Sequence, residues 1–184
     1  MPRAGLSRAA VVDVALALVD EKGLEALSLA AVADRAGVAA PSLYKHVGSL
    51  AELRDLMAEQ VIKQLTTLFA GEVMGRSGDE AVAALLRAYR AYVLQNPGRY
   101  HLMPLDPLRQ SPALAQAGRE QMDVFVAVMR GYGLEQSAAT HAMRRLRAAA
   151  HGFATLEAGG GFGMSENVDE SYEQLIEMCL RSLR

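Results

Sequence analysis

GVAAPSLYKHV, residues Gly37 to Val47, is the stretch that decides the fold of this chain. It follows a short apolar-periodic segment, Leu29 to Ala36, and it precedes a helix-capping signal, Ser49 to Glu52. The order is a short helix, a tight turn at a glycine, and a second short helix that opens on Pro41. This order predicts a helix-turn-helix, the motif whose second helix enters the major groove of DNA.

Within this motif, helical spacing separates an inner side from an outer side. Leu43 and Val47 are four residues apart and are expected to pack inward. Tyr44, Lys45 and His46 are then expected around the outward side of the second helix. Tyr44 could instead be a half-buried packing residue, and His46 could merely cap the helix, since a cation near a helix C-terminus is favourable.

Capping signals predict the helices on both sides of the motif. Ser7 caps a first helix that runs to about Lys22, where Gly23 can take a left-handed stop conformation, and Ser28 caps the second helix. Ser49 with Glu52 forms a capping box for a long helix to about residue 73. Further helices are predicted at about 78–95, after a second capping box of Ser77 and Glu80, and at 99–103, 111–130, 135–158 and 168–183.

The totals agree with an all-α protein of about nine helices. The 184 residues are 51% hydrophobic and 22% charged, with much Ala and few β-branched runs, which favours a globular helical chain. We divide it into a three-helix DNA-binding domain, residues 1–48, and a helical domain, residues 49–184. No run of eighteen apolar residues predicts a membrane span, and MPRAGLSR lacks the apolar core of a signal peptide. The single cysteine, Cys179, fits a reducing, cytoplasmic setting.

The protein is less basic than DNA-binding proteins usually are. The net charge is −2, and the first sixty residues carry more Asp and Glu than Lys and Arg. The cations expected on the docking face are Arg3, Arg8, Lys45 and His46. Few phosphate contacts predict a shallow salt dependence, because each neutralised phosphate adds roughly 0.9 to the slope.

Residues in and around the motif resemble those of one known family. The matching residues are Gly23, Ser28, Leu29, Ala33, Gly37-Val38, Pro41 to Tyr44, His46-Val47 and Ser49. In these residues the chain is similar to the tetracycline-repressor (TetR) family of bacterial transcription regulators. NPGRYHLM, from Asn96, and AHGFATLEAGG, from Ala150, resemble a subgroup with a Trp-His-Gly-type C-terminal domain, although the chain contains no Trp.

The resemblance implies how the motif would contact DNA. Ser28, Tyr44 and His46 would contact phosphates, while Ala40, Pro41, Ser42 and Lys45 would face bases or the adjacent backbone. Ala30, Ala39 and Ala40 stand where the family often has long polar side chains, and they offer only methyl contacts, for instance to thymine. Leu50 stands at a position where the family commonly has a lysine that contacts a phosphate, so the resemblance implies that this contact is lost. Specificity is then expected to depend on Ser42, Lys45, the arm around Arg3, or DNA shape.

The resemblance also implies an effector pocket and a homodimer in the C-terminal domain. Aromatic and methionine side chains of the middle helices are the candidates for a largely apolar small-molecule effector. They are Phe69, Tyr89, Tyr92, Tyr100, Met103, Met122, Phe125 and Met129. Candidates for a dimer contact through the last two helices are Leu146, Phe153, Leu156, Leu175, Ile176 and Cys179.

Catalytic and metal sites find little support in the sequence. His101 and His151 have no second ligand at helical spacing, so a pocket or buried hydrogen-bonding role is favoured over metal binding. AGGGFG, from Ala158, follows a helix and not a strand, so it is a turn rather than a phosphate loop. We therefore predict no cofactor, no metal and no enzymatic activity.

The prediction is a ligand-responsive repressor that binds a near-palindromic operator as a homodimer and is released by a small molecule. Two alternatives remain open at this point. One is a helical small-molecule carrier or enzyme that does not bind DNA, and the other is a regulator that acts through protein partners. The acidic first domain and the alanines of the motif are the support for the latter.

Overall fold

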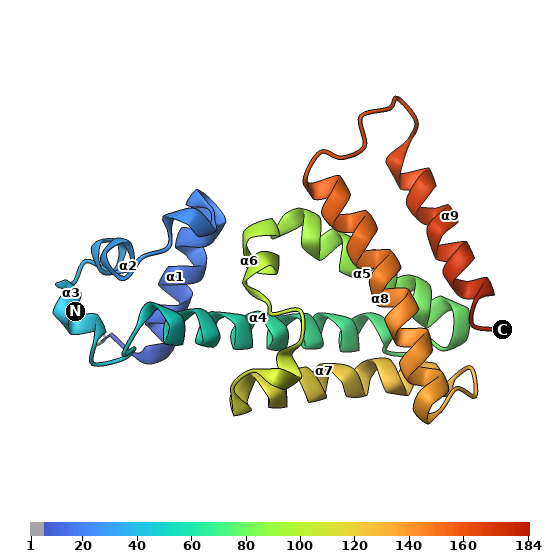
Figure 1. Cartoon of the computed structure of the whole chain (residues 1–184), viewed down its shortest axis with the longest axis horizontal. Coiled ribbons are helices and arrows are strands. Elements are labelled where there is room, and N and C mark those ends of the chain that lie inside the picture. Colours follow the sequence, from blue (N-terminus) through green and yellow to red (C-terminus); the bar gives the residue numbers. More distant parts are fainter. Residues whose placement is uncertain (1–5) are drawn as a thin grey trace. The chain divides into compact units, whose positions relative to one another are not determined.

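The structure, a computed structural model, describes residues 6–184 (Figure 1). These residues form nine α-helices and two short 3₁₀ helices, and they include no strand, so the predicted all-α fold is confirmed. The 3₁₀ helices are Leu24–Ala26 and Pro107–Arg109. The α-helices are α1 (Arg8–Lys22), α2 (Leu29–Ala36), α3 (Ala40–Leu43), α4 (Leu50–Val73), α5 (Gly78–Gln95), α6 (Pro97–Leu102), α7 (Pro112–Arg130), α8 (Gln136–Ala158) and α9 (Val168–Arg181). None of the described helices is long and apolar enough to span a membrane.

The described chain divides into two compact units. The first unit holds the described residues up to Lys63 together with Gly98–Gly118. The second unit holds Gln64–Pro97 together with Arg119–Arg184. The chain passes between the units within α4, α6 and α7. These compact units do not test the predicted division into a DNA-binding domain, residues 1–48, and an effector-binding and dimerisation domain, residues 49–184, which stays a prediction.

The first unit begins with helices whose ends follow the predicted capping signals. Ser7 Oγ accepts the N–H of Ala10 at 3.1 Å, and Ser28 Oγ accepts the N–H of Ala31 at 3.1 Å. Gly37 ends α2 in the left-handed conformation, with φ 66° and ψ 33°. Gly23 ends α1 with φ 78° but ψ 169°, so the predicted left-handed stop is wrong there. That positive φ still favours glycine, and the chain continues directly into the first 3₁₀ helix.

Of the two predicted capping boxes, one forms, with its carboxylate on the N–H of the residue before the N-cap. Ser49 Oγ accepts the N–H of Glu52 at 3.0 Å, and the Glu52 carboxylate accepts the N–H of Gly48 at 2.7 Å. Ser77, in contrast, makes no side-chain cap within the described chain. Glu80 lies 3.4 Å from the Arg76 guanidinium, so its carboxylate is engaged with that cation. Gly78 has φ 53°, a left-handed conformation that interrupts the usual geometry of a capped first turn.

In the second unit, α5 packs mainly on α8, and both helices contact α9. The buried Tyr172 hydroxyl of α9 donates to the Leu86 carbonyl of α5 at 2.6 Å. Cys179 is buried in the same helix, as the apolar spacing predicts, and burial raises the pKa of its thiol. Facing sides of α5, α8 and α9 therefore form one part of the core of this unit.

Candidate DNA-binding and effector sites

The interior of the helix-turn-helix holds its two short helices in place. Leu43 and Val47 are both buried, which confirms their predicted inward packing. At the turn, Val38 donates its N–H to the Ala33 carbonyl at 3.0 Å. The left-handed Gly37 makes this tight connection possible, because other residues adopt that conformation only at a cost.

The second helix of the motif is shorter than predicted. Regular helix α3 ends at Leu43, and Tyr44, Lys45 and His46 form a helical turn. The backbone N–H groups of His46 and Val47 both donate to the Leu43 carbonyl, at 2.8 Å and 2.9 Å. The expectation that Tyr44 to His46 lie on a regular helix is therefore wrong. The chain must leave the helix here because Gly48 and Ser49 already cap α4.

The predicted DNA-contacting side chains lie largely on the surface of the first unit. Tyr44 is 59% exposed, so it is not a packing residue. Ser42 and His46 are half-buried. The remaining described candidates are exposed, and they are Ser28, Ala39, Ala40, Pro41 and Lys45. Arg3 lies outside the described residues.

Arg8 serves a structural role that the sequence did not reveal. Its Nε donates to the His46 carbonyl at 2.9 Å, and its guanidinium pairs with Glu52 at 2.7 Å. The same Glu52 carboxylate accepts the Gly48 N–H. Arg8 and Glu52 thus hold the end of the motif against α1 and α4. The Arg8 charge is offset by Glu52, which leaves Lys45 as the main cation among the described candidates for contacting DNA.

Three of the predicted effector-pocket residues meet in the second unit. The Phe125 ring meets the Phe69 ring edge-on with centroids 5.4 Å apart, and the Tyr89 ring lies parallel to Phe69 at 6.3 Å. Met129 is fully buried, Met122 is exposed and Tyr92 is half-buried. We refer to Phe69, Tyr89 and Phe125 as the aromatic cluster.

The other two predicted pocket residues belong to the first unit. Met103 packs against a buried cluster of Ala58, Ile62, Leu114 and Ala117. The ring of Tyr100 meets that of His101 at 6.4 Å. The predicted set is therefore divided between the units, and the aromatic cluster is the part that the structure brings together.

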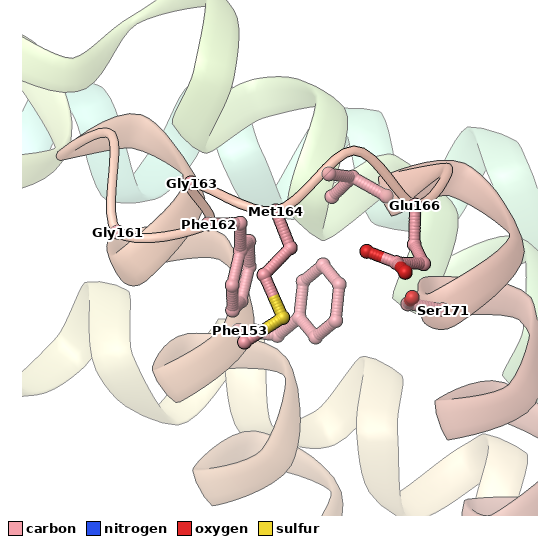
Figure 2. Close-up of a pocket in the computed structure, with 8 residues that line it drawn as sticks. Phe153, Gly161, Phe162, Gly163, Met164, Glu166 and Ser171 are labelled. Carbon is pink, nitrogen blue, oxygen red and sulfur yellow. The ribbon is translucent and has the colours of Figure 1, made fainter.

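A hollow of about 310 Å³ lies at the connection between α8 and α9 (Figure 2). Phe153, Phe162 and Met164 form its apolar walls, and Glu166 and Ser171 contribute oxygen atoms at one side. The Phe153 and Phe162 rings are 4.7 Å apart. None of the predicted pocket residues lines this hollow, and Phe153 had been predicted for the dimer contact instead.

The predicted dimer residues fall into two groups. Leu146, Ile176 and Cys179 are buried within the protomer, so they have little surface to offer a partner. Phe153 and Leu175 are half-buried, and Leu156 is 55% exposed. Met178, which the prediction did not include, is also exposed on α9.

Within the first unit, α6 is fastened to α1. The Arg99 guanidinium donates twice to the Asp20 carboxylate, at 2.8 Å and 2.6 Å. Next to this pair, Gly98 lies so close to α1 that a Cβ on it would be 2.8 Å from Val19 Cγ1. The sequence marked neither contact, because Asp20 and Arg99 are far apart along the chain.

Comparison with known proteins agrees with this geometry. Residues 11–57 match the family described as bacterial regulatory proteins, tetR family, and residues 82–179 match the tetracyclin repressor-like C-terminal domain. An uncharacterized HTH-type transcriptional regulator of Mycobacterium tuberculosis is 37% identical over 158 residues, covering 85% of this chain and 72% of that protein. Another, of Bacillus subtilis, is 34% identical over 185 residues, covering 99% of this chain and 95% of that protein.

Solved structures share the fold over nearly the whole chain. A protein with unknown function from Rhodococcus sp. RHA1 has a TM-score of 0.83 and 25% identity, and the match covers 99% of this chain and 98% of that one. A TetR variant from Acinetobacter baumannii, in complex with minocycline, has a TM-score of 0.73 and 17% identity over 97% of this chain and 96% of that one. At that identity the likeness shows the fold alone.

The family matches span both the helix-turn-helix and the C-terminal helices, and the relatives named above are transcriptional regulators. The Trp-His-Gly subgroup has no such support. This chain belongs to the TetR family of bacterial regulatory proteins, and it is a DNA-binding transcriptional regulator and not an enzyme.

Proposed function

We propose that this regulator is a homodimeric repressor that leaves a near-palindromic operator when a small, largely apolar molecule binds its C-terminal domain. The observation that carries the proposal is a family helix-turn-helix with Tyr44 and Lys45 exposed beside a packed inner side. As a bacterial regulator acting on DNA, it would work in the cytoplasm. Residues 1–48 would bind DNA, and residues 49–184 would bind the effector and dimerise.

On the DNA side, polar groups would set the register and small groups would approach the bases. Tyr44 and Ser28 carry exposed hydroxyls that can donate to phosphate oxygens, and His46 can do so through its ring. Lys45 can reach either a phosphate or the acceptors of guanine. The remaining contacts would come from Arg3, Ala39, Ala40, Pro41 and Ser42.

The effector would bind among the apolar side chains of the C-terminal domain. The aromatic cluster supports this, because stacked and edge-on rings give flat apolar walls. The structural neighbour bound to minocycline has the same fold. Tyr92, Tyr100, Met103, Met122 and Met129 stay candidates for the walls around it.

The dimer would form through α8 and α9. The support is two exposed apolar side chains, Leu156 on α8 and Met178 on α9. Phe153 and Leu175 on the same helices are half-buried. Leu146, Ile176 and Cys179 would act from inside, by fixing how α8 and α9 pack within each protomer.

Release of DNA would follow from a difference in effector affinity between two dimer states. In the binding state the two motifs would stand one turn of DNA apart, about 34–36 Å. The helix α4 runs from the capped end of the motif to Val73 and is one route for the change. The Arg99–Asp20 pair offers a second route, because α6 begins two residues after α5 ends.

The first experiment is selection of bound sequences from a random DNA pool with the purified protein, at low and at physiological salt. An enriched near-palindrome is expected, and it would supply the probe for effector screening. If a folded dimer enriched no sequence at either salt, repression through DNA would be excluded, and a regulator acting through protein partners would take its place. Operator affinity that stayed unchanged across an effector screen would exclude the release mechanism.

Two variants then test the contacts on the selected operator. Tyr44→Phe keeps the ring and removes the hydroxyl, so operator affinity should fall by about five- to tenfold. Lys45→Ala should change the preferred sequence if Lys45 contacts a base. It should instead weaken all sequences evenly, and lower the salt slope by about 1, if Lys45 holds a phosphate. Lys22→Ala, on an exposed lysine at the end of α1, is the control expected to change neither.

A further inference from the structure

Gln121 on α7 carries a buried polar atom that the rest of the described chain does not satisfy. Its Nε2 is shielded from solvent and has no hydrogen-bond partner among the described residues 6–184. A buried amide N–H group without an acceptor is unfavourable, and nearly all such groups in folded proteins find a partner. A methionine of similar shape would fill the same space without that penalty.

The position of Gln121 places this amide beside the aromatic cluster. Gln121, Phe125 and Val128 follow one another at spacings of four and three residues, so they share one face of α7. Phe125 on that face meets the ring of Phe69 edge-on, and Tyr89 lies parallel to Phe69. Val128 is buried, so this face of α7 is turned inward.

The surroundings select the kind of group that the amide could bind. Among the described residues, no charged or polar residue as a whole is buried. A carboxylate brought to Nε2 would therefore be desolvated with one neutral donor to offset it, which is unfavourable. A neutral acceptor such as a ketone, ester or amide carbonyl loses much less on leaving water, and one N–H group is enough to satisfy it.

We propose that Gln121 Nε2 is the hydrogen-bond donor for the effector, and that the effector is a neutral, flat, mainly aromatic molecule with a carbonyl oxygen. The inference rests on the proposed function, since it assigns a chemical class to that effector. The rings of the aromatic cluster contact the flat body, and Gln121 orients it through the carbonyl. Gln121 is thus a specificity-determining residue that discriminates against pure hydrocarbons.

This assignment predicts opposite effects of one substitution on stability and on binding. Gln121→Met removes the unsatisfied donor and keeps the volume, so the urea midpoint of the ligand-free protein should stay the same or rise. The same change should weaken binding of a carbonyl-bearing ligand. If Gln121 served the fold alone, the substitution would lower the midpoint and treat all apolar ligands alike.

The probe is 6-propionyl-2-dimethylaminonaphthalene, a flat aryl ketone whose fluorescence moves to the red when its carbonyl accepts a hydrogen bond. Its matched partner is 2-dimethylaminonaphthalene, which has the same ring without the ketone. Both are titrated into the full-length wild type, Gln121→Met and Gln174→Met. Gln174 is exposed on α9, so its substitution controls for a change of Gln to Met away from the cluster.

The wild type should bind the ketone more tightly than the ketone-free amine. Gln121→Met should bind the ketone about tenfold less tightly, which corresponds to 1.4 kcal/mol, and its bound emission should move to the blue. The ketone-free amine should bind all three proteins equally. Equal ketone affinity for wild type and Gln121→Met, or no saturable ketone binding to the folded wild type, would overturn the proposal. DNA selection is scored separately, so a protein that selects no operator but shows the Gln121 effect fails only as a repressor.

Discussion

At the scale of single residues, the missing side chain of Gly98 decides how closely α6 can approach α1. A Cβ at this position would lie 2.8 Å from Val19 Cγ1 and 3.3 Å from the Val19 carbonyl oxygen. Val19 is β-branched and buried, so it cannot move aside easily. We expect Gly98→Ala to lower the free energy of unfolding by about 1–3 kcal/mol, as overpacking does elsewhere.

Gly71 in α4 is the matched control for this prediction, because a Cβ there would meet nothing within 4 Å. Gly71→Ala should raise the free energy of unfolding by about 0.5–1 kcal/mol through helix propensity alone. Urea denaturation followed by circular dichroism measures both variants. A Gly98→Ala protein as stable as Gly71→Ala would show that α6 does not lie against Val19.

Single residues also show where sequence analysis of the binding site succeeds and where it stops. The inward packing of Leu43 and Val47 follows from their spacing, since four residues make about one helical turn. The partner of Arg8 does not, because Glu52 lies 44 positions away and its carboxylate was already assigned to a cap. Likewise Gln121 is a single polar residue within an apolar stripe, and only its surroundings reveal that its amide lacks an acceptor.

At the scale of elements, capping residues predicted the helices better than they predicted the contacts between helices. Ser7, Ser28 and Ser49 mark helix starts because their hydroxyls satisfy backbone N–H groups a few residues ahead. The start of α6 at Pro97, two residues before the predicted start, has the same local logic, since proline suits a first helical turn. The pairing of α6 with α1 has no local signal, because it joins segments 79 residues apart.

The Arg99–Asp20 pair should make a measurable contribution to the joining of α6 and α1. It has two parallel hydrogen bonds and is partly shielded from solvent, which favours it over an ordinary surface ion pair. A double-mutant cycle with Asp20→Ala and Arg99→Ala should give a coupling of about 1 kcal/mol. The Arg181–Glu177 pair, 3.9 Å apart with both side chains 69% exposed, should give a coupling near zero. Equal coupling energies in the two cycles would show that the Arg99–Asp20 pair does not hold α6 to α1.

In the second unit, Arg90 joins three elements at once. From α5 its guanidinium reaches Glu157 of α8 at 2.6 Å and Asp169 of α9 at 2.7 Å. It also lies 4.9 Å from the centre of the Tyr172 ring, a cation–π distance. The hydrogen bond to Glu157, opposed by desolvation and helped by Asp169, raises the pKa of Arg90. The side chains of Arg90 and Glu157 are only 14% and 18% exposed, so each charge depends on the other to offset its loss of hydration.

Replacing Arg90 should therefore destabilise the protein. Arg90→Met leaves the Glu157 carboxylate partly buried without its cation and should lower the free energy of unfolding by about 3 kcal/mol near pH 7, as measured by urea denaturation. Adding Glu157→Gln to Arg90→Met should recover part of the lost free energy of unfolding at neutral pH. If it recovers none, the loss comes from the packing of the Arg90 side chain and not from the unpaired carboxylate.

At the scale of the whole molecule, the proposed dimer gives a reason for a glycine, Gly152, whose lack of a side chain nothing within the protomer requires. Gly152 lies in the C-terminal third of α8, one turn before the exposed Leu156, and a Cβ on it would meet nothing within 4 Å of the same chain. In a monomer Gly152→Ala should therefore stabilise the helix by about 0.5–1 kcal/mol, as Gly71→Ala does. In a dimer formed through α8 and α9, the added methyl group would stand in the interface.

The two variants together can therefore test the dimer. If α8 packs closely against a partner at Gly152, the added methyl group should weaken the dimer by about tenfold, a change of 1.4 kcal/mol. Sedimentation equilibrium of wild type, Gly152→Ala and Gly71→Ala measures the dissociation constant of each dimer. Gly71→Ala should associate like wild type, because it raises helix stability without touching α8 or α9. If Gly152→Ala also associates like wild type and is simply more stable, the partner does not pack on this part of α8. The exposure of Leu156 and Met178 would then need another explanation, and repression by two motifs one DNA turn apart would need another interface to hold them.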